Sequence, residues 1–253
     1  MDAKAPLVDW RSGEAYAALI HGDRRVFAWE WLRRSAAYRQ ACQESRLSSS
    51  AAAHFGLHRL EPAAGDSSAA RPVWRAQVDP YVAVAAASVR MDDIETFDFA
   101  RLAPMAKCVV AGGGTEHWLW SSGERHVRLD VVAGTLRDGP VRLDYRLGGF
   151  ASALPGLIAT ERLIALTRSG SFAAGLYPPE RRARRWALVL RTHDALVAGA
   201  SQREIAEHLF GLGHLPRWRI VAPSWRQRVH RLVVAAREAA RTEPIRWLNG
   251  KWP

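Results

Sequence analysis

The sequence has very little of what would mark a secreted or membrane-spanning protein. It contains only two cysteines, Cys42 and Cys108, in 253 residues, and neither has a second Cys or a His at metal-ligand spacing. This excludes a disulfide framework and indicates reduced thiols in a cytoplasmic protein. No run of about 18 apolar residues is present, and the first twenty residues lack a basic start followed by an apolar segment. We therefore expect neither a membrane span nor a signal peptide.

The motifs that usually carry catalysis are also missing. There is no Gly-x-Ser-x-Gly, and neither cysteine stands in a nucleophile motif. His54 and His58 are four residues apart but have no Glu after the first His and no third ligand, so surface histidines explain them better than zinc. Asp92, Asp93 and Glu95 are not part of a spaced oxygen-ligand loop. We expect a protein that is not an enzyme and needs no metal or other cofactor.

Acidic residues are scarce in the last third of the chain, which makes that part strongly basic. From Arg181 to the end there are fifteen Arg and Lys residues but only five Asp and Glu residues, so this stretch holds +10 of the net charge of +11. An even scatter of basic residues would indicate solubility or composition bias. Their concentration in one region favours a polyanionic partner, with nucleic acid ahead of a membrane surface.

The basic region begins with two predicted helices. The first opens at Pro178-Pro-Glu, and its inward stripe comprises Trp186, Val189, Leu190, His193 and Leu196. In the second, Ser201 and Glu204 form the pattern of a capping box. Gly211 supplies the left-handed residue that commonly closes a helix. The second helix is therefore predicted to begin after Ser201 and to end at Gly211.

A third predicted helix follows a loop of twelve residues, from Leu212 to Pro223. Ser224 is its expected N-cap, and it should end before Pro244, which cannot continue a helix. One side is apolar and comprises Trp225, Val229, Leu232, Val233, Ala236 and Ala240. The other side is polar: Gln227, His230, Arg231 and Arg241, flanked by Arg226 and Arg228. This pattern suits a helix that enters a DNA groove, and it equally describes an ordinary amphipathic surface helix.

Two short helices are predicted near the N-terminus. Ser12 is the expected cap of the first, which would run through Ile20, and the second would follow the turn His21-Gly-Asp. Aromatic and small residues of the second helix share one face (Phe27, Trp31, Tyr38 and Ala41). One interpretation is an aromatic mini-core. The alternative adds Arg33, Arg34 and exposed aromatic residues as a face that docks a partner.

The middle of the chain changes from a helical to a strand-like period. Residues 61–72 are rich in Ala, Gly, Ser and Pro, which indicates a flexible linker or a surface loop. Three alternating stretches then begin at Glu116, Val127 and Val141, and predict a small antiparallel meander. The last two share Val-Arg-Leu-Asp, which places Val and Leu on one face. A helix from Leu154 to Arg168 should follow, with Leu157, Ile158, Leu163 and Leu166 inside.

These elements predict an α+β protein. We expect an N-terminal helical module over residues 1–60, a linker or loop over 61–72, the β-meander region over 73–152, and a helical DNA-binding domain over 153–253. Function is expected to lie in the last of these, because it carries the excess positive charge.

Two parts of the sequence resemble a known family. Asp9-Trp10 and Phe27-Ala-Trp-Glu-Trp-Leu-Arg-Arg-Ser-Ala-Ala-Tyr-Arg are similar to a proteobacterial transcriptional regulator-like domain. Arg191-Thr-His-Asp-Ala-Leu-Val-Ala-Gly-Ala-Ser-Gln-Arg-Glu-Ile-Ala-Glu-His-Leu-Phe-Gly and Ser224-Trp-Arg-Gln-Arg-Val-His-Arg-Leu resemble a variant helix-turn-helix domain. That domain occurs in RovC-like activators of type VI secretion and FseA-like activators of conjugative-element excision. The twelve-residue loop departs from the usual turn of three or four residues.

The resemblance implies a cytoplasmic, DNA-binding transcriptional activator, in some members oligomeric and in some controlled by a small antiactivator protein. We expect double-stranded promoter DNA as partner, a homo-oligomer, and no membrane. The alternative is a protein–protein adaptor or antiactivator with the same fold and no DNA binding. Its weakness is that a pure adaptor gains little from a charge of +10.

The expected DNA-contacting residues fall into two groups. Base contacts are assigned to the third helix, because Gln pairs with adenine and Arg with guanine in the major groove. This group comprises Arg226, Gln227, His230 and Arg231, with Arg228 beside them. Backbone contacts are assigned to the surrounding residues Arg184, Arg185, Gln202, Arg203, Arg217 and Arg219.

Overall fold

The computed structural model describes residues 7–44, 49–65, 68–77, 79, 81–89, 95–212, 220 and 223–248. Its helices are η1 (Glu14–Tyr16), η2 (Ala18–His21), α1 (Arg24–Arg34), α2 (Ala36–Glu44), α3 (Ser49–His54), η3 (Phe99–Met105), α4 (Phe150–Ser169), η4 (Ala174–Leu176), α5 (Ala183–Val197), α6 (Gln202–Phe210), α8 (Pro223–Arg241) and α9 (Pro244–Leu248). Its strands are β1 (Val82–Ser88), β2 (Thr96–Phe97), β3 (Ala106–Val110), β4 (Glu116–Ser121), β5 (His126–Ala133) and β6 (Val141–Arg146). The predicted α+β class is confirmed.

The chain divides into two compact units that differ from the expected segments. Unit 1 joins the two ends of the chain, Met1–Glu44 and Pro179–Pro253, and unit 2 is the stretch between them, Ser45–Pro178. The N-terminal helices α1 and α2 therefore share a unit with α5, α6 and α8. The described residues of 61–72 lie within unit 2 as a loop, which is one of the two predicted alternatives, and Glu61 and Ala63 are buried in it.

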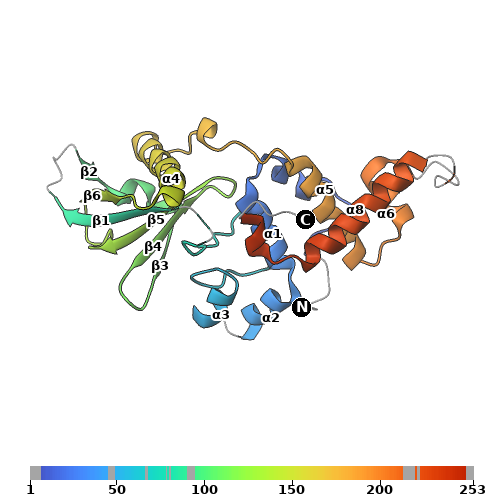
Figure 1. Cartoon of the computed structure of the whole chain (residues 1–253), viewed down its shortest axis with the longest axis horizontal. Helices are drawn as coiled ribbons and strands as arrows, with labels where there is room; N and C mark the ends of the chain where they lie inside the picture. Colours follow the sequence, from blue (N-terminus) through green and yellow to red (C-terminus); the bar gives the residue numbers. More distant parts are fainter. Residues whose placement is uncertain are drawn as a thin grey trace. The chain divides into compact units, whose positions relative to one another are not determined.

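Unit 2 is built on one mixed sheet with the strand order β2-β6-β1-β5-β4-β3 (Figure 1). The predicted stretches at Glu116, Val127 and Val141 are all strands, but they do not form one meander. β4 pairs antiparallel with β3 and β5, whereas β1 lies between β5 and β6 and runs parallel to β5. The sequence pattern missed β1 because its run Val-Ala-Val-Ala-Ala-Ala-Ser is rich in Ala, which is depleted in strands.

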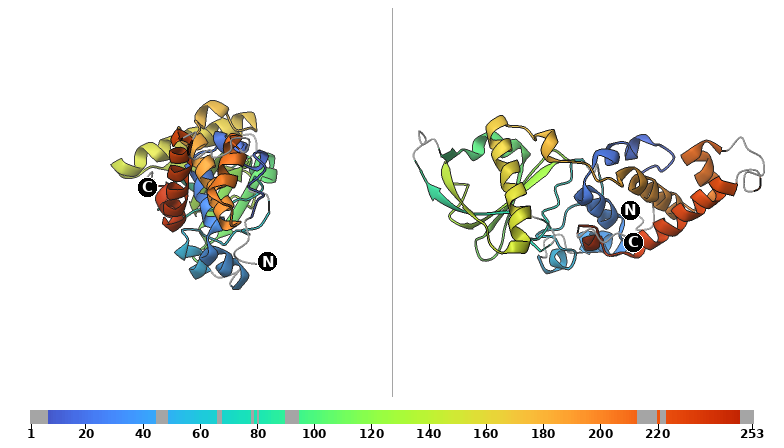
Figure 2. Two further views of the ribbon diagram at one scale, coloured as in Figure 1. Left: turned by 90° about the vertical axis from the view of Figure 1, so that its right-hand side faces the viewer. Right: turned by 45° about the horizontal axis from the view of Figure 1, so that its top comes forward.

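One face of this sheet is apolar and is covered by α4, as both the first and the second figure show (Figures 1 and 2). Val127, Leu129, Val141 and Leu143 lie in this core, together with the tryptophans of β4, so the predicted inward face of Val-Arg-Leu-Asp is confirmed. From α4, the core receives Ala159, Leu163 and Leu166. Leu157 and Ile158 were predicted inside but are exposed, because the first half of α4 is apolar around most of its circumference.

The opposite face of the sheet is polar and is covered only in part. On β5, Arg128 and Asp130 are buried, and the imidazole Nδ1 of His117 lies 2.8 Å from the Asp130 carboxylate. The ring of His58 stacks on that of His117 with centroids 3.5 Å apart. The equivalent Arg and Asp of β6 are exposed. The Arg and Asp of the repeated motif are therefore buried in a polar network on β5 and exposed on β6.

The N-terminal part of unit 1 differs from the prediction at its first helix. Two 3-10 helices, η1 and η2, replace the single helix expected after Ser12, and Gly13 before η1 provides no side-chain cap. Asp23 caps α1 by accepting from the backbone N–H groups of Arg25 and Val26. The chain is extended at Ser35, so the predicted second helix is divided into α1 and α2.

The aromatic residues of α1 pack against the last third of the chain. Phe27 lies edge-on to Trp186 of α5 at 5.2 Å, and Trp31 stacks on Trp247 of α9 at 5.4 Å. Trp186 and Trp247 also meet edge-on, 5.3 Å apart. Aromatic rings at these separations add stability beyond the area they bury. The predicted aromatic core is therefore present, and its partners come from the basic region.

No helix in the described part of the chain is long and apolar enough to cross a membrane. Within that same part, no group of three or more His, Cys, Asp and Glu side chains is arranged to hold a metal ion.

Candidate nucleic-acid interface

The interface begins with the local structure of α6, which the sequence predicted correctly. Ser201 accepts from the backbone N–H of Glu204, whose carboxylate accepts from the backbone N–H of Ser201. These backbone and side-chain hydrogen bonds from Ser201 lower the pKa of the Glu204 carboxyl group. Gly211 has a φ of 67° and closes the helix in the left-handed conformation. The start and the end of α6 are thus fixed by residues next to it in sequence.

α8 carries the exposed basic face. It begins at Pro223, so Ser224 lies inside its first turn rather than at the N-cap as predicted, and Pro occupies a position where its missing N–H has no consequence. Val229, Leu232, Val233 and Ala236 are buried as expected, and Ala239 is buried in place of Ala240. Arg226, Gln227, His230 and Arg231 are exposed on the opposite side.

The buried side of α8 fixes its position against α5 and α6. Val229 and Val233 belong to a core with Ile205 and Ala206 of α6. The indole of Trp10, from the N-terminal segment, fills the same core. Because this core is contributed by three helices and one distant segment, the exposed face of α8 is held on a rigid support.

Two adjacent depressions lie on the exposed side. The first, about 550 Å³, is lined by Gln202 of α6 and by Arg226, Gln227, His230 and Arg231 of α8. The second, about 490 Å³, is lined by Arg184, Arg185 and Leu188 of α5 and by Arg228, Arg231 and Leu232 of α8. Arg231 belongs to both. We refer to the two together as the basic groove.

The basic groove brings together most of the predicted DNA-contacting residues. It contains five arginines, and no carboxylate belongs to the described lining of either depression. Arg184 and Arg185 stand in the first turn of α5, where the helix dipole disfavours positive charge and no side-chain cap is present. An anion bound in the groove would offset both the mutual repulsion of the guanidinium groups and this unfavourable position.

Three predicted residues lie outside the groove. Arg203 is exposed on α6 but does not line either depression. Arg217 and Arg219 lie outside the described residues.

Arg228 has a position that the sequence pattern did not predict. Its guanidinium lies over the ring of Phe210 at 4.7 Å and over that of Trp225 at 5.0 Å. Trp225 was predicted to be buried, but it is only partly buried and packs at the rim of the core, against Phe210. Cation–π contacts with two rings orient the Arg228 side chain and leave its charge in place.

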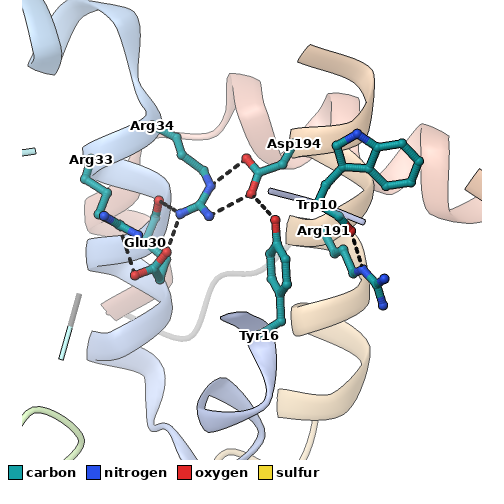
Figure 3. A network of polar contacts seen from close by, with 7 residues as sticks. All are labelled: Trp10, Tyr16, Glu30, Arg33, Arg34, Arg191 and Asp194. Carbon is teal, nitrogen blue, oxygen red and sulfur yellow. Dashed lines mark hydrogen bonds and ion pairs between the residues drawn. The ribbon is translucent and has the colours of Figure 1, made fainter. Parts of the chain in front are cut away.

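The helix α5, which lines the second depression of the basic groove, is joined to α1 by buried ion pairs (Figure 3). The guanidinium of Arg34 donates from Nε and Nη2 to the two carboxylate oxygens of Asp194, at 2.7 Å each. It also pairs with Glu30, which Arg33 contacts at 3.0 Å. The hydroxyl of Tyr16 donates to Asp194 at 2.6 Å, and burial, followed by the Asp194 charge, raises the pKa of that phenol.

This network overturns one expectation about the N-terminal module. Arg33 and Arg34 were the proposed charges of an exposed docking face, but both side chains are only 4% exposed and are paired with carboxylates. The sequence contained one local sign of this arrangement, the i,i+4 spacing of Glu30 and Arg34. The role of Asp194 had no sign in the sequence, because its partners come from the other end of the chain.

A second tie anchors the N-terminal segment. Arg191 of α5 donates from Nε to the backbone carbonyl of Trp10 at 2.7 Å and from Nη2 to that of Arg11 at 2.8 Å. The Trp10 ring also lies edge-on to His208 of α6. The N-terminal segment is therefore a structural part of the unit that carries the basic groove.

Two family models match the chain. Residues 9–71 match the proteobacterial transcriptional regulator-like domain, and residues 155–243 match the DNA-binding domain of a type VI secretion transcription factor, the RovC type. Together the matches cover more than half of the chain, so the resemblance noted at each end is confirmed. No curated protein matches the sequence significantly. Each match spans parts of both units, since residues 49–71 and 155–178 belong to unit 2.

Proposed function

We propose that this chain, which carries a transcriptional regulator-like domain and a RovC-type DNA-binding domain, is a sequence-specific DNA-binding transcription factor. The observation that carries the proposal is the basic groove, where five arginines face solvent with no carboxylate in the described lining. Phosphate oxygens satisfy such a cluster, and the Gln and His side chains among the arginines offer hydrogen bonds to base edges. The site of action is then the cytoplasmic chromosome or a mobile element.

In this proposal α8 is the helix that reads the major groove. Four residues are assigned to bases, because all are exposed and line the same depression: Arg226, Gln227, His230 and Arg231. Arg184 and Arg185 are assigned to phosphates, since they approach the groove from α5. Arg228 is assigned to holding the DNA in place through its positive charge, because two aromatic rings fix its guanidinium.

Three further residues extend the proposed footprint. Gln202 lines the groove next to α8 and is assigned to the backbone with Arg203. Arg217 and Arg219, in the loop before α8, are proposed as additional phosphate contacts from the sequence alone.

We further propose that the protein acts as an activator and that its targets are genes of type VI secretion or of conjugative elements. The support is the family of its DNA-binding domain, whose description names type VI secretion. We also propose, from the same resemblance, that a small antiactivator protein controls its activity. A reporter driven by the candidate promoter should rise in expression when the protein is supplied, whereas a fall would make it a repressor.

Titration of the protein with its own upstream DNA, followed by fluorescence anisotropy, tests the proposal. Specific binding should exceed binding to random DNA by about 10³-fold or more. The double variant Arg226→Gln/Arg231→Gln should abolish that preference, and Arg125→Gln in unit 2 is the matched control. Equal and weak binding to both DNAs would instead favour the adaptor or antiactivator alternative.

The expected homo-oligomer is proposed to form through an apolar surface of unit 2. Phe150, Leu154, Leu157 and Ile158 are exposed on α4, and Tyr145 and Leu147 lie exposed just before it. A stable interface takes ~800 Å² from each partner, and these six side chains are proposed as its apolar centre. No charged residue occurs between Leu147 and Thr160, so two copies can face each other without repulsion.

Sedimentation velocity tests this interface. Leu154→Glu should shift the protein towards the monomer, because it buries a charge in an apolar contact. Arg168→Glu, at the exposed far end of the same helix, is the control and should leave the oligomer intact. A wild-type protein that sediments as a monomer at micromolar concentration would remove self-association from the proposal.

A further inference from the structure

A third depression in unit 1 lies apart from the basic groove, and their described linings share no residue. It measures about 470 Å³ and is bordered by the junction of α1 and α2, by α5, and by the end of α8. The volume falls in the range of small-molecule sites, ~300–1,000 Å³. Such sites are mostly apolar and contain a few polar groups that orient the ligand. The chemistry of this lining therefore indicates which class of ligand it suits.

The described lining of this pocket offers no free charge to a ligand. It contains two arginines, Arg34 and Arg39, and no carboxylate. The Arg34 side chain is only 4% exposed, and its guanidinium is bonded to the carboxylates of Glu30 and Asp194 (Figure 3). Arg39 also has a partner of its own. A charged ligand would leave water without gaining a counter-ion, which is costly, so the pocket suits a neutral molecule.

The wall of the pocket is mainly apolar. Trp31 contributes an aromatic ring, which is held by its stack on Trp247 with ring centroids 5.4 Å apart. Val197, which is 40% exposed, and small side chains such as Ala240 extend the apolar surface. Covering this surface removes it from water, and a second aromatic ring packed against a fixed indole adds a favourable contact. The apolar part of the ligand is therefore expected to be aromatic.

One polar side chain of the lining, His193, is available to bind a ligand. Its ring lies against that of Trp31 with centroids 5.1 Å apart, and within the described part of the chain no hydrogen bond holds the imidazole. Burial lowers the pKa of His193, so the imidazole is neutral at pH 7 and offers one donor and one acceptor. The Thr242 hydroxyl, which donates to the carbonyl of Glu238, can still accept a hydrogen bond. A hydroxyl or N–H group on a ligand would satisfy these atoms.

We propose that this pocket binds a small neutral aromatic molecule that carries a hydroxyl or N–H group, of the phenol or indole class. The aromatic ring packs against Trp31 and covers Val197 and Ala240, and the polar group hydrogen-bonds to His193. The proposal does not rest on DNA binding. The ligand would contact the C-terminal parts of α5 and α8, the two helices whose N-terminal halves line the second depression of the basic groove.

Ligand-observed saturation-transfer NMR on the full-length protein tests the proposal with three probes. Phenol has the ring and the hydroxyl, fluorobenzene has the ring without a donor, and benzoate has the ring with a charge. Phenol should bind saturably with a Kd of about 1 mM or lower, and fluorobenzene about two- to tenfold more weakly, because a hydrogen bond is lost. Benzoate should bind at least about tenfold more weakly than phenol. The proposal is overturned if phenol shows no saturable binding up to about 10 mM, or if either of the other probes binds as tightly.

Two variants locate the binding in this pocket. His193→Phe keeps a ring beside Trp31 and removes both nitrogens, so phenol should lose its advantage over fluorobenzene. Ala240→Phe should abolish phenol binding, because the new ring fills the space of the ligand. Val234→Phe is the matched control, since Val234 is exposed on the same helix and does not belong to the described lining.

Far-UV circular dichroism verifies the folding of each variant. The Val234→Phe protein should bind phenol as the wild type does. A folded Ala240→Phe protein with wild-type affinity would place the probe elsewhere and contradict the proposal. A folded His193→Phe protein that still prefers phenol over fluorobenzene would contradict the assigned hydrogen bond.

Discussion

Arg34 and Asp194 form a bidentate ion pair across 160 residues of sequence, with both N···O distances at 2.7 Å. The pair is buried, and each partner has a second partner: Glu30 for the arginine and Tyr16 for the aspartate. It joins the helix that follows the N-terminal segment to the helix that borders the basic groove. The regulator-like end of the chain is therefore needed to complete the proposed DNA-binding unit.

Asp194→Ala should destabilise unit 1 strongly. Removing one partner of a buried ion pair leaves an uncompensated charge and typically costs about 3–5 kcal/mol. We expect a loss of that size in the free energy of unfolding by urea. Glu207→Ala, which removes an exposed carboxylate of α6, is the control and should change stability by less than ~0.5 kcal/mol. A similar small change in Asp194→Ala would show that the network contributes little.

Base contacts by α8 predict a loss of specificity. Alanine at Gln227 or Arg231 should weaken binding to the cognate site by about 1–3 kcal/mol per residue and leave binding to random DNA nearly unchanged. Competition titrations with both DNAs measure the ratio. If both affinities fall equally, these side chains contact the DNA backbone instead.

Phosphate contacts predict a dependence on salt. If about four to six arginines neutralise phosphates, log K should fall with log salt with a slope near −4 to −5. Arg184→Gln/Arg185→Gln should flatten this slope by about one to two units and leave sequence preference intact, because both residues line the groove from α5. A double variant with the wild-type slope would exclude these two residues from the phosphate contacts.

The two apolar anchors of α8 should differ in their effect on stability. Val229 is fully buried, and Val229→Ala should cost about 2 kcal/mol in unfolding free energy. Trp225 is only partly buried, so Trp225→Ala should cost less than the ~3–5 kcal/mol of a buried aromatic residue. Because its ring holds Arg228, the Trp225 variant should also weaken DNA binding, even when it melts close to the wild type.

The stacked histidines of unit 2 predict a pH dependence of stability. Burial, and then the neighbouring His117 and Arg128, lower the pKa of His58 to about 3. An unfolded chain has this group at its ordinary pKa near 6.5, so it binds more protons than the folded protein between these values. The contribution of neutral His58 to the free energy of unfolding is fully present above about pH 6.5 and is lost as the pH falls towards 3. His58→Phe should show a shallower decline of stability than the wild type over this range.

The sequence predicts a structural feature well when the residues that determine it are close together in the chain, and poorly when they are far apart. The capping box of α6 involves Ser201 and Glu204 alone, so a local pattern was sufficient. The alternation of β5 and β6 correctly gave the inward residues. The order of the strands could not be predicted, because the position of β1 depends on pairing with residues far along the chain.

The candidate site also combines features that are local in sequence with features that depend on distant residues. The exposed residues of α8 follow from the helical period. The predicted exposure of Gln227, His230 and Arg231, with Arg226 on their flank, is confirmed. Arg184 and Arg231 line the same depression because α5 packs against α8. The spacing of apolar residues within each helix does not encode that packing. For α4, a helix with leucines on both sides gave no sign of which side would meet the sheet.

Because unit 1 is built from both ends of the chain, the order of synthesis matters for the cell. α1 is made before unit 2, yet its partners Trp186, Asp194 and Trp247 are made after unit 2. Unit 2 is complete once residue 178 has emerged, so it can fold while the N-terminal helices still await their partners. A truncated translation product would thus contain a folded sheet and no basic groove. Incomplete chains would therefore not compete with the finished protein for its promoter.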